Sequence, residues 1–229
     1  MGEDAASLFA ELGLSAVALA FLLFVALLLS SYVKIVTVLG MVRLGFGIGS
    51  LPATFVTGGL ALALSFFVMY PQLRESGAAM DNVLKSRSPV TDRDRAQAVN
   101  AGIAEWKKFV ETHSQRTEVE RFQGIAKRLD DKFRASRGEA NVAQPPVEAN
   151  SWRVLAPAFV ISELREAFQT GLSIFLPFLV VDLLVAVALT GVGMDRLNPA
   201  LISFPFKVLL FVTLDGWGLI TSNLVSTYG

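Results

Sequence analysis

The chain has 229 residues, of which 53% are hydrophobic and 17% are charged, and its mean hydropathy is +0.53. Soluble domains carry about 25% charged residues, so a soluble fold of this length could not easily bury so much apolar surface. A formal net charge of zero gives no electrostatic case for binding nucleic acid, and the absence of Cys together with a single His, His113, excludes disulfides, thiolate catalysis and the usual Cys- or His-pair metal sites.

The first apolar stretch, from Leu12 to Val33, contains no charged residue and predicts a helix of about 33 Å, long enough to cross a membrane. A signal peptide would instead combine a basic start with a shorter apolar run. Here Glu3, Asp4 and Glu11 make the start acidic. We therefore expect an uncleaved membrane helix.

A second apolar stretch runs from Pro52 to Tyr70, where Pro52 fits a first helical turn and Pro71 fits a helix stop. Lys34 and Arg43 lie between the two stretches, and no acidic residue accompanies them. Basic residues in short loops favour the cytoplasmic side of a membrane. This loop is therefore expected in the cytoplasm, and the segment after residue 71 on the opposite side.

Residues 71–153 form a polar block that holds 15 of the 20 Lys and Arg residues and 12 of the 20 Asp and Glu residues. Apolar side chains recur in it every three to four residues, which predicts at least two amphipathic helices. The two runs are Ala96, Val99, Ile103, Trp106 and Val110, then Val119, Phe122, Ala126, Leu129 and Phe133. Thr117 and Glu120 match a capping box, so the second helix is expected to begin at Thr117. Residues 136–151 contain Gly and Pro without periodicity and are expected to form a loop.

Two further apolar stretches, 171–193 and 200–228, follow a mixed segment that carries Glu163. Ionisable side chains interrupt these stretches at Asp182, Lys207 and Asp215. Pro177 and Pro205 also lie inside them, where each removes a helix hydrogen bond. Such features are usual where helices pack on protein or line a polar pathway. Two interpretations stay open: partnered packing residues in a helical bundle, or residues that line a conduit or a subunit contact.

These elements predict an all-α, membrane-type fold. Four long apolar segments form helical hairpins, and a soluble helical block is inserted between the second and the third. The expected parts are an N-terminal apolar hairpin (1–71), a polar helical insert (72–153) and a C-terminal apolar hairpin (154–229).

Motifs of serine hydrolases, zinc proteases and phosphate-binding loops are absent from the sequence. Asp182 and Asp215 could share a proton, as in an aspartyl intramembrane protease, but Gly191–Asp195 has one residue more than the signature of that class. A small-solute or ion-coupled transporter is another alternative, with Asp182, Lys207 and Asp215 as its coupling site. The two apolar halves share no motif, which disfavours it. We expect no enzymatic activity, no cofactor and no metal.

Several short motifs, in a fixed order, resemble the FliP/SctR family of export-apparatus subunits from bacterial type III secretion systems. In the first half they are Val38–Arg43 and Leu64–Pro71. In the second half they are Pro157–Leu164, Ala167–Gly171, Ile174–Leu183, Ile202–Lys207, Leu210–Val212 and Asp215–Trp217. The resemblance covers about residues 30–71 and 155–225, and is looser in the polar block.

This resemblance implies a homo-pentamer that joins two other membrane subunits of the export apparatus and forms a helical channel for unfolded secreted proteins. It implies the bacterial inner membrane, with the insert 72–153 on the periplasmic side. Asp182, Lys207, Asp215 and Glu163 lie in the matching motifs, which implies packing or inter-subunit contacts. Flagellar relatives tend to carry a cleavable signal peptide, which this N-terminus does not resemble, so the injectisome branch is favoured.

The hinge between the last two apolar stretches departs from the family. Family members carry a run of methionines there that narrows the pore, and flexible thioethers suit a deformable seal. In this chain only Met194 remains, followed by Asp195 and Arg196. Met194 and Leu197 are therefore our candidates for the pore constriction. An ordinary hairpin turn, or a seal supplied by partner subunits, is the alternative.

Overall fold

The computed structural model describes residues 2–85, 90–137, 146–194 and 196–228, with side chains from residue 13 onward. Within these residues the chain forms eight helices and no strand, which confirms the all-α prediction. The helices are α1 (Gly2–Leu28), α2 (Tyr32–Gly45), α3 (Leu51–Lys85), α4 (Asp92–Thr112), α5 (Arg116–Arg137), α6 (Trp152–Gly191), α7 (Pro199–Thr213) and α8 (Gly216–Ser226).

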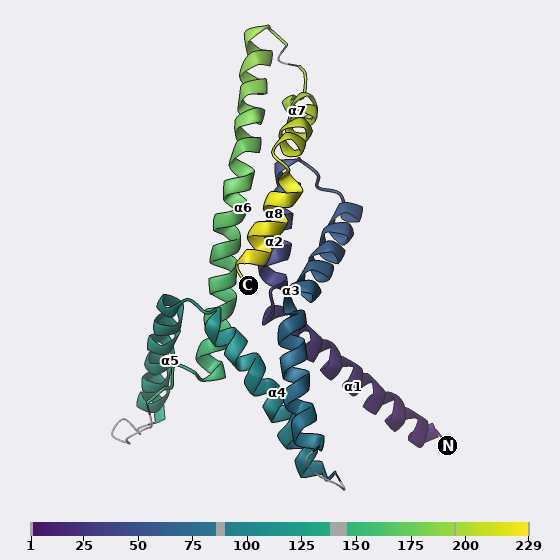
Figure 1. Ribbon diagram of the computed structural model, residues 1–229, viewed down its shortest axis with the longest axis vertical. Coiled ribbons are helices and arrows are strands. Elements are labelled where there is room, and N and C mark those ends of the chain that lie inside the picture. The colour runs from purple at the N-terminus through teal and green to yellow at the C-terminus, as the bar shows by residue number, and fades with distance from the viewer. Residues whose placement is uncertain (1, 86–89, 138–145, 195, 229) are drawn as a thin grey trace.

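The helix α6 is the longest element and forms the axis of a column (Figure 1). The helices α2 and α7 pack against α6, and α3 packs against α2. One core lies among these helices and includes Val38, Leu39, Phe178, Phe211 and Ile220. A second core lies lower, where α4 meets α3 and the start of α6, and is built from Met69, Phe109, Val110, Leu155 and Phe159.

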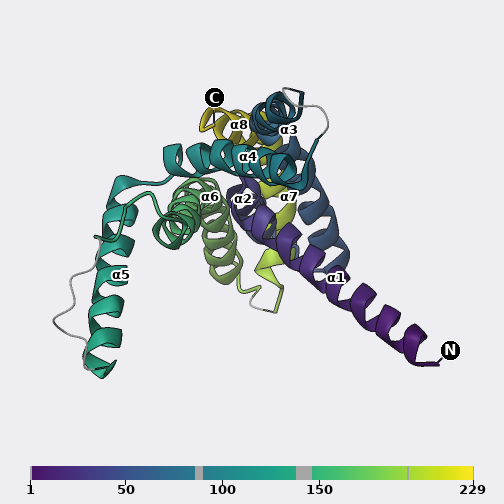
Figure 2. The same cartoon turned by 90° about the horizontal axis from the view of Figure 1, so that it is seen from below.

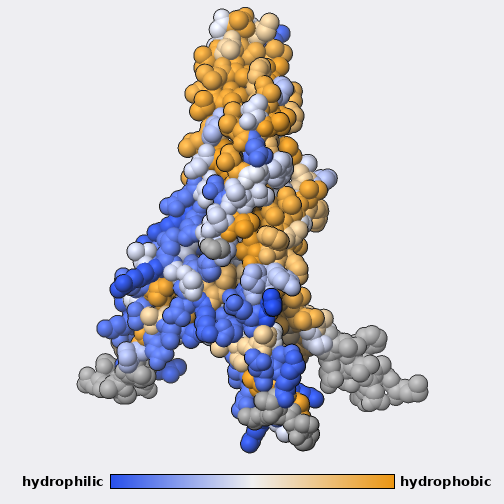
Figure 3. Space-filling model, viewed as in Figure 1, coloured by the Kyte–Doolittle hydropathy of each residue, from blue (hydrophilic) through white to orange (hydrophobic). Residues whose placement is uncertain are grey.

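Two helices extend away from the foot of this column. The helix α1 projects from its foot on one side and α5 on the other, while α4 runs beside the lower half of α3 (Figures 1 and 2). On the face that Figure 3 shows, the upper column is mainly hydrophobic, and hydrophilic residues gather towards the foot. Hydrophobic and hydrophilic residues are therefore separated along the column on this face.

The first apolar stretch is not one straight helix, contrary to the prediction for Leu12–Val33. The chain bends by 71° between α1 and α2. The hydroxyl of Ser30 donates to the Leu27 carbonyl at 2.8 Å and accepts from the Tyr32 amide at 3.2 Å. The indole N–H of Trp106 donates to the Leu29 carbonyl at 3.0 Å. In a continuous helix these backbone groups would bond to one another. At the bend, the side chains of Ser30 and Trp106 supply partners for them instead.

The expected stop at Pro71 is also wrong, because α3 continues through it to Lys85. A proline inside a helix removes one backbone hydrogen bond, so neighbouring contacts must hold the segment together. The helix α4 supplies them along the second half of α3. The Gln72 side chain, next to Pro71, donates to the Glu105 carbonyl of α4 at 3.0 Å.

The insert contains the two expected amphipathic helices, α4 and α5, but its capping box lies elsewhere. Thr117 is inside α5, which begins at Arg116, and Glu120 instead pairs with Arg116 at 2.9 Å. The capping box belongs to Thr91 and Asp94 at the start of α4. Residues 146–151 are not helical, as expected for the loop, and the rest of that loop up to residue 145 lies outside the described residues.

Two helices, α3 and α6, are long and apolar enough to cross a membrane. The pairs α1–α2 and α7–α8 pass the same test when each bent pair is taken together, and the second pair bends by 58°. The described residues therefore contain between two and four candidate spans, in line with the four apolar segments of the sequence.

The close packing of α2 on α6 gives a matched pair of glycine substitutions. A methyl group at Gly45, in the last turn of α2, would overlap the buried ring of Phe178 on α6, whereas a methyl group at Gly40 of the same helix meets nothing within 4 Å. Gly45→Ala should destabilise the protein by about 1–3 kcal/mol through overpacking. Gly40→Ala should stabilise it by about 0.5–1 kcal/mol, because alanine loses less conformational freedom in a helix. Thermal unfolding in detergent measures both, and equal effects would contradict this packing.

Candidate functional site

The α6–α7 turn carries the two constriction candidates at the far end of the column (Figure 1). Met194 and Leu197 are both exposed, and the Leu197 amide donates to the Met194 carbonyl at 3.2 Å, which closes the turn. Gly193 has a positive φ of 73°, a conformation that favours glycine. Asn198 caps α7 and Pro199 occupies its first turn. The chain thus holds two apolar side chains at the tip of its apolar hairpin, and Asp195 between them lies outside the described residues.

Asp182 and Lys207 form an ion pair that joins α6 to α7. The Lys207 ammonium lies 2.7 Å from an Asp182 carboxylate oxygen and also donates to the Gly45 carbonyl at 2.8 Å. The Ser203 hydroxyl donates to the other Asp182 oxygen at 2.5 Å. Because Gly45 is the last residue of α2, one lysine connects three helices. The Lys207 side chain is 3% exposed and that of Asp182 is 36% exposed, so the lysine depends more heavily on its partner.

Asp215 is separate from this pair. It is the N-cap of α8, and its side chain accepts from the Gly218 amide at 3.3 Å. Its φ of 48° lies in the left-handed region, so it forms the corner between α7 and α8. Asp182 and Asp215 therefore have different partners and different tasks. Their arrangement offers no support for two carboxylates that share a proton, the feature on which the protease hypothesis depends.

A second polar cluster, at the foot of the column, contains Glu163. The Lys34 ammonium of α2 lies 2.6 Å from Glu166 and 3.5 Å from Glu163, both on α6. The Tyr228 hydroxyl hydrogen-bonds Glu163, and the Tyr228 ring lies 4.4 Å below the Lys34 ammonium. Lys34 and Glu163 are almost completely buried. One lysine is thus shared between two carboxylates, and a tyrosine that follows α8 closes the cluster.

This cluster also fixes the insert to the column. The Gln115 side chain, between α4 and α5, donates to Glu166 at 3.1 Å, and its backbone amide donates to the Ser162 hydroxyl at 2.8 Å. A further ion pair at 2.5 Å joins Arg165 of α6 to Glu118 of α5. The polar insert therefore contacts the first half of α6 through Ser162, Arg165 and Glu166.

The prediction that Lys34 is a loop residue marking the cytoplasmic side is wrong. Lys34 lies buried inside α2 and is paired with α6. Its charge therefore carries no information on the side of the membrane. The sequence does not indicate that Lys34 is buried and paired, and it does not single out Glu166, Ser203 or Tyr228 as partners. The isolated charge of Lys34 between Val33 and Ile35 was the available signal, because such a residue in an apolar helix requires a buried counter-ion.

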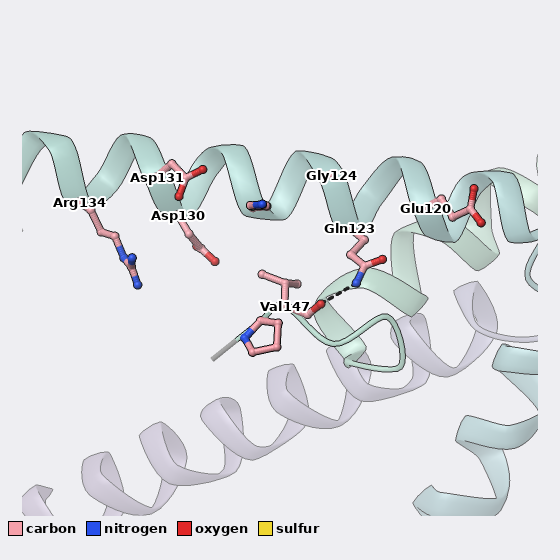
Figure 4. A pocket seen from close by; sticks show the side chains of 9 residues that line it. Glu120, Gln123, Gly124, Asp130, Asp131, Arg134 and Val147 are labelled. Carbon is pink, nitrogen blue, oxygen red and sulfur yellow. Dashed lines mark hydrogen bonds between the residues drawn. The ribbon is translucent and has the colours of Figure 1, made fainter. Parts of the chain in front are cut away.

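A shallow groove of about 580 Å³ lies along α5, on the side that faces Pro146 and Val147 (Figure 4). The charged side chains in it are of both signs, namely Glu120, Lys127, Asp130, Asp131 and Arg134. The Gln123 side chain donates to the Val147 carbonyl at 2.7 Å. The described residues contain no group of three or more His, Asp or Glu side chains that could hold a metal ion. The groove therefore has the composition of a solvated polar face.

Each of Asp182, Lys207 and Glu163 has a partner within this chain, and Asp215 caps a helix. Buried charges that are paired and hydrogen-bonded hold helices in register but present little polarity to their surroundings.

The Asp182–Lys207 pair predicts an asymmetric response to mutation. Asp182→Asn leaves the buried Lys207 without a counter-charge, which should cost about 3–5 kcal/mol. Lys207→Met should cost less, because Asp182 is partly exposed and keeps the Ser203 hydroxyl. The double variant should be more stable than Asp182→Asn alone, since an apolar side chain then meets a neutral amide. Melting temperatures in detergent rank the three proteins, and an Asp182→Asn variant as stable as Lys207→Met would contradict this assignment.

Comparison with known proteins agrees with the motifs. Residues 15–224 match the model of the FliP family. The hypersensitivity response secretion protein HrcR of Ralstonia nicotianae is 33% identical over 220 residues, which cover 96% of this chain and 97% of the relative. The Yop proteins translocation protein R of Yersinia pestis is 34% identical over 206 residues, 90% of this chain and 89% of the relative. The flagellar biosynthetic protein FliP of Bacillus subtilis is 34% identical over 206 residues, 89% and 85% of the two chains.

The family match covers the column, the insert and the tip of the α6–α7 hairpin, so the resemblance drawn from short motifs holds for nearly the whole chain. The chain belongs to the FliP family.

Proposed function

We propose that this protein is a core subunit of a bacterial type III secretion export apparatus, where several subunits together form a helical gate for unfolded secreted proteins. The observation that carries the proposal is the apolar surface that the chain leaves uncovered. Membership in the FliP family and the names of the relatives, which refer to secretion, translocation and flagellar biosynthesis, support it.

The exposed surface is too large for a protein that works alone in water. The chain exposes 15273 Å². A compact monomer of 24.7 kDa would expose about 10,000 Å². Much of the excess is apolar, because large hydrophobic side chains are exposed on α1, α3, α6 and α7. Lipid, other subunits or both must cover this surface in the functional state.

Two apolar grooves beside α1 support contact with other subunits. One, of about 510 Å³, lies between α1, α4 and α6 and includes Trp106 and Trp152. The other, of about 420 Å³, lies between α1, α5 and α6 and includes Phe122. Both are lined almost entirely by carbon, a composition typical of the buried centre of an interface. We propose a homo-pentamer that binds two other membrane subunits of the same apparatus.

Within this assembly, the proposed place of the α6–α7 tip is the narrow part of the pore. Met194 and Leu197 are exposed apolar side chains at the end of a long hairpin, so copies brought around an axis could form an apolar ring. Asp182, Lys207, Glu163 and Asp215 would then act inside each subunit and hold the hairpin and the insert in position. The pairing of three of them within one chain supports this role rather than a transport site for ions.

A stalled substrate tests the position of the tip. A photo-crosslinking amino acid at Met194 or Leu197 should form crosslinks to a secreted protein arrested in transit, since a constriction touches whatever passes through it. Phe55 of α3, which is also exposed and apolar, serves as the matched control. Strong crosslinks at Phe55 and none at the tip would contradict the proposed pore.

We also propose that the protein lies in the bacterial inner membrane, as an N-terminal apolar part (1–71), a periplasmic insert (72–153) and a C-terminal apolar part (154–229). The apolar helices support the membrane. Arg43 is the one charged residue between Ile35 and Leu73, and it supports a cytoplasmic α2–α3 connection. The relatives named for secretion and translocation support the injectisome branch.

Single cysteines can test this orientation cleanly, because the chain has no cysteine of its own. Arg95→Cys lies on an exposed part of α4, and Ile48→Cys lies in the α2–α3 connection. A maleimide reagent that cannot cross the inner membrane should label position 95 in cells with a permeabilised outer membrane. It should label position 48 only after lysis. The reverse pattern would place the insert in the cytoplasm.

A further inference from the structure

A small surface pocket lies among α6, α7 and α8. Its volume is about 130 Å³, and all the residues that line it are nonpolar except Ser173. Phe178, Phe211 and Leu219 are among them, and no side chain of the described residues fills the space. An apolar cavity of about 150 Å³ can hold a benzene molecule. The pocket therefore has room for about one aromatic side chain.

An isolated acidic residue stands at the rim of this pocket. Asp215 lies between Leu214 and Gly216, which both line the pocket. It is the only charged residue in the stretch 208–228. Its exposed carboxylate accepts from the Gly218 amide, but it forms no ion pair with any residue that the structure describes. A negative charge without a counter-ion is therefore placed beside an apolar hollow.

The complementary arrangement is found near the start of α3. The Phe55 side chain is 79% exposed, more than any other large hydrophobic side chain in the described residues. The Arg43 guanidinium donates to the hydroxyl of the adjacent residue, Thr54, at 2.5 Å, which holds the arginine near Phe55. Arg43 forms no ion pair with the described residues, and its Nε has no hydrogen-bond partner among them. A projecting aromatic ring is thus accompanied by a positive charge without a counter-ion.

The pocket and the Phe55 site lie at a similar height on the column but on different sides of it. The Phe178 ring of the pocket packs against Gly45, which is only two residues, about 3 Å along the axis of α2, from Arg43. The helix α2 lies between α6 and the start of α3 (Figures 1 and 2). Phe55 does not line the pocket of its own chain, but rotation about an axis along the column can bring it to the pocket of another copy.

We propose that neighbouring copies of this chain meet through these two sites. The Phe55 ring of one copy enters the pocket of the next, and Arg43 of the first copy pairs with Asp215 of the second. Two different surfaces that match form a heterologous contact, which can repeat around a closed ring. The inference names one contact of the proposed homo-oligomer and rests on that assembly.

The chemistry of both sites favours a second copy over other occupants. The pocket and the ring agree in size and polarity, and a charge of opposite sign stands beside each. A lipid chain would fill the pocket but would leave both charges without partners. Aromatic side chains and arginine are also enriched at protein interfaces.

Crosslinking between copies tests the contact with the full chain, which has no cysteine of its own. Phe55→Cys and Leu219→Cys are produced in the same cells, each with a different tag, so that a link between the tags joins two copies. Leu219 is exposed and lines the pocket. A short bifunctional maleimide should link them. Phe67→Cys, also exposed on α3 but about 18 Å further along it, is the matched control and should not link to Leu219→Cys.

Native mass spectrometry of the same samples separates this contact from the assembly as a whole. A homo-oligomer without a link between positions 55 and 219, or with equal linking from position 67, overturns the contact and leaves the assembly standing. A link from position 219 only to a different co-expressed subunit also overturns it. A preparation in which no homo-oligomer forms overturns both the contact and the proposed assembly.

A double-mutant cycle tests the ion pair. Asp215→Asn removes the charge but keeps a side chain that caps helices and tolerates the left-handed conformation, so α8 should stay folded. Arg43→Gln or Asp215→Asn alone should weaken association of the copies about tenfold, the low end for close charges at an interface. The double variant should be no weaker than either single variant, because the pair is already broken. Native mass spectrometry at falling protein concentration measures this, and losses that multiply to about 100-fold would contradict the pair.

Discussion

The structure depends on one constraint: its helices carry more apolar surface than a single chain can bury. The two cores are small and lie along the column, and the outward faces of α1, α3, α6 and α7 remain apolar and uncovered. In water such surfaces would associate without specificity. A membrane, or copies of the same chain, removes that cost. The fold therefore makes sense as one part of a larger membrane assembly, and relatives in the FliP family are named for secretion and for flagellar biosynthesis.

The buried charges follow from the same constraint. In an apolar environment an unpaired charge is far more costly than in water, so each must find a partner nearby. Lys207 joins Asp182 and the end of α2, and Lys34 joins two carboxylates of α6. Because these pairs close within the chain, they specify how the helices fit together and leave the outer faces free for lipid or subunits. The ion pairs within the chain therefore fix how the helices pack, and they also leave the outer apolar surface available to lipid or other subunits.

The sequence was sufficient for the class of fold and the family, because these depend on local composition and on motifs in order. Prediction from the sequence failed where contacts between residues far apart in the chain determine the structure. Pro71 is a good helix stop by itself, but α4 packs beside it and α3 continues. Lys34 resembles a loop charge until its partners, more than a hundred residues away, are known. Thr117 fits a capping box as well as Thr91 does, and only the path of the chain between α4 and α5 distinguishes them. The partners of Asp182 were unpredictable for the same reason, although its need for one was clear.

The central claim is that other subunits cover the apolar surface of this chain. Native mass spectrometry of the protein in mild detergent, alone and co-expressed with the membrane proteins of its neighbouring genes, tests this most directly. The account predicts a discrete ring-sized homo-oligomer that gains smaller membrane subunits on co-expression. A monomer or dimer that recruits nothing, in a detergent that preserves the helical fold, would contradict it.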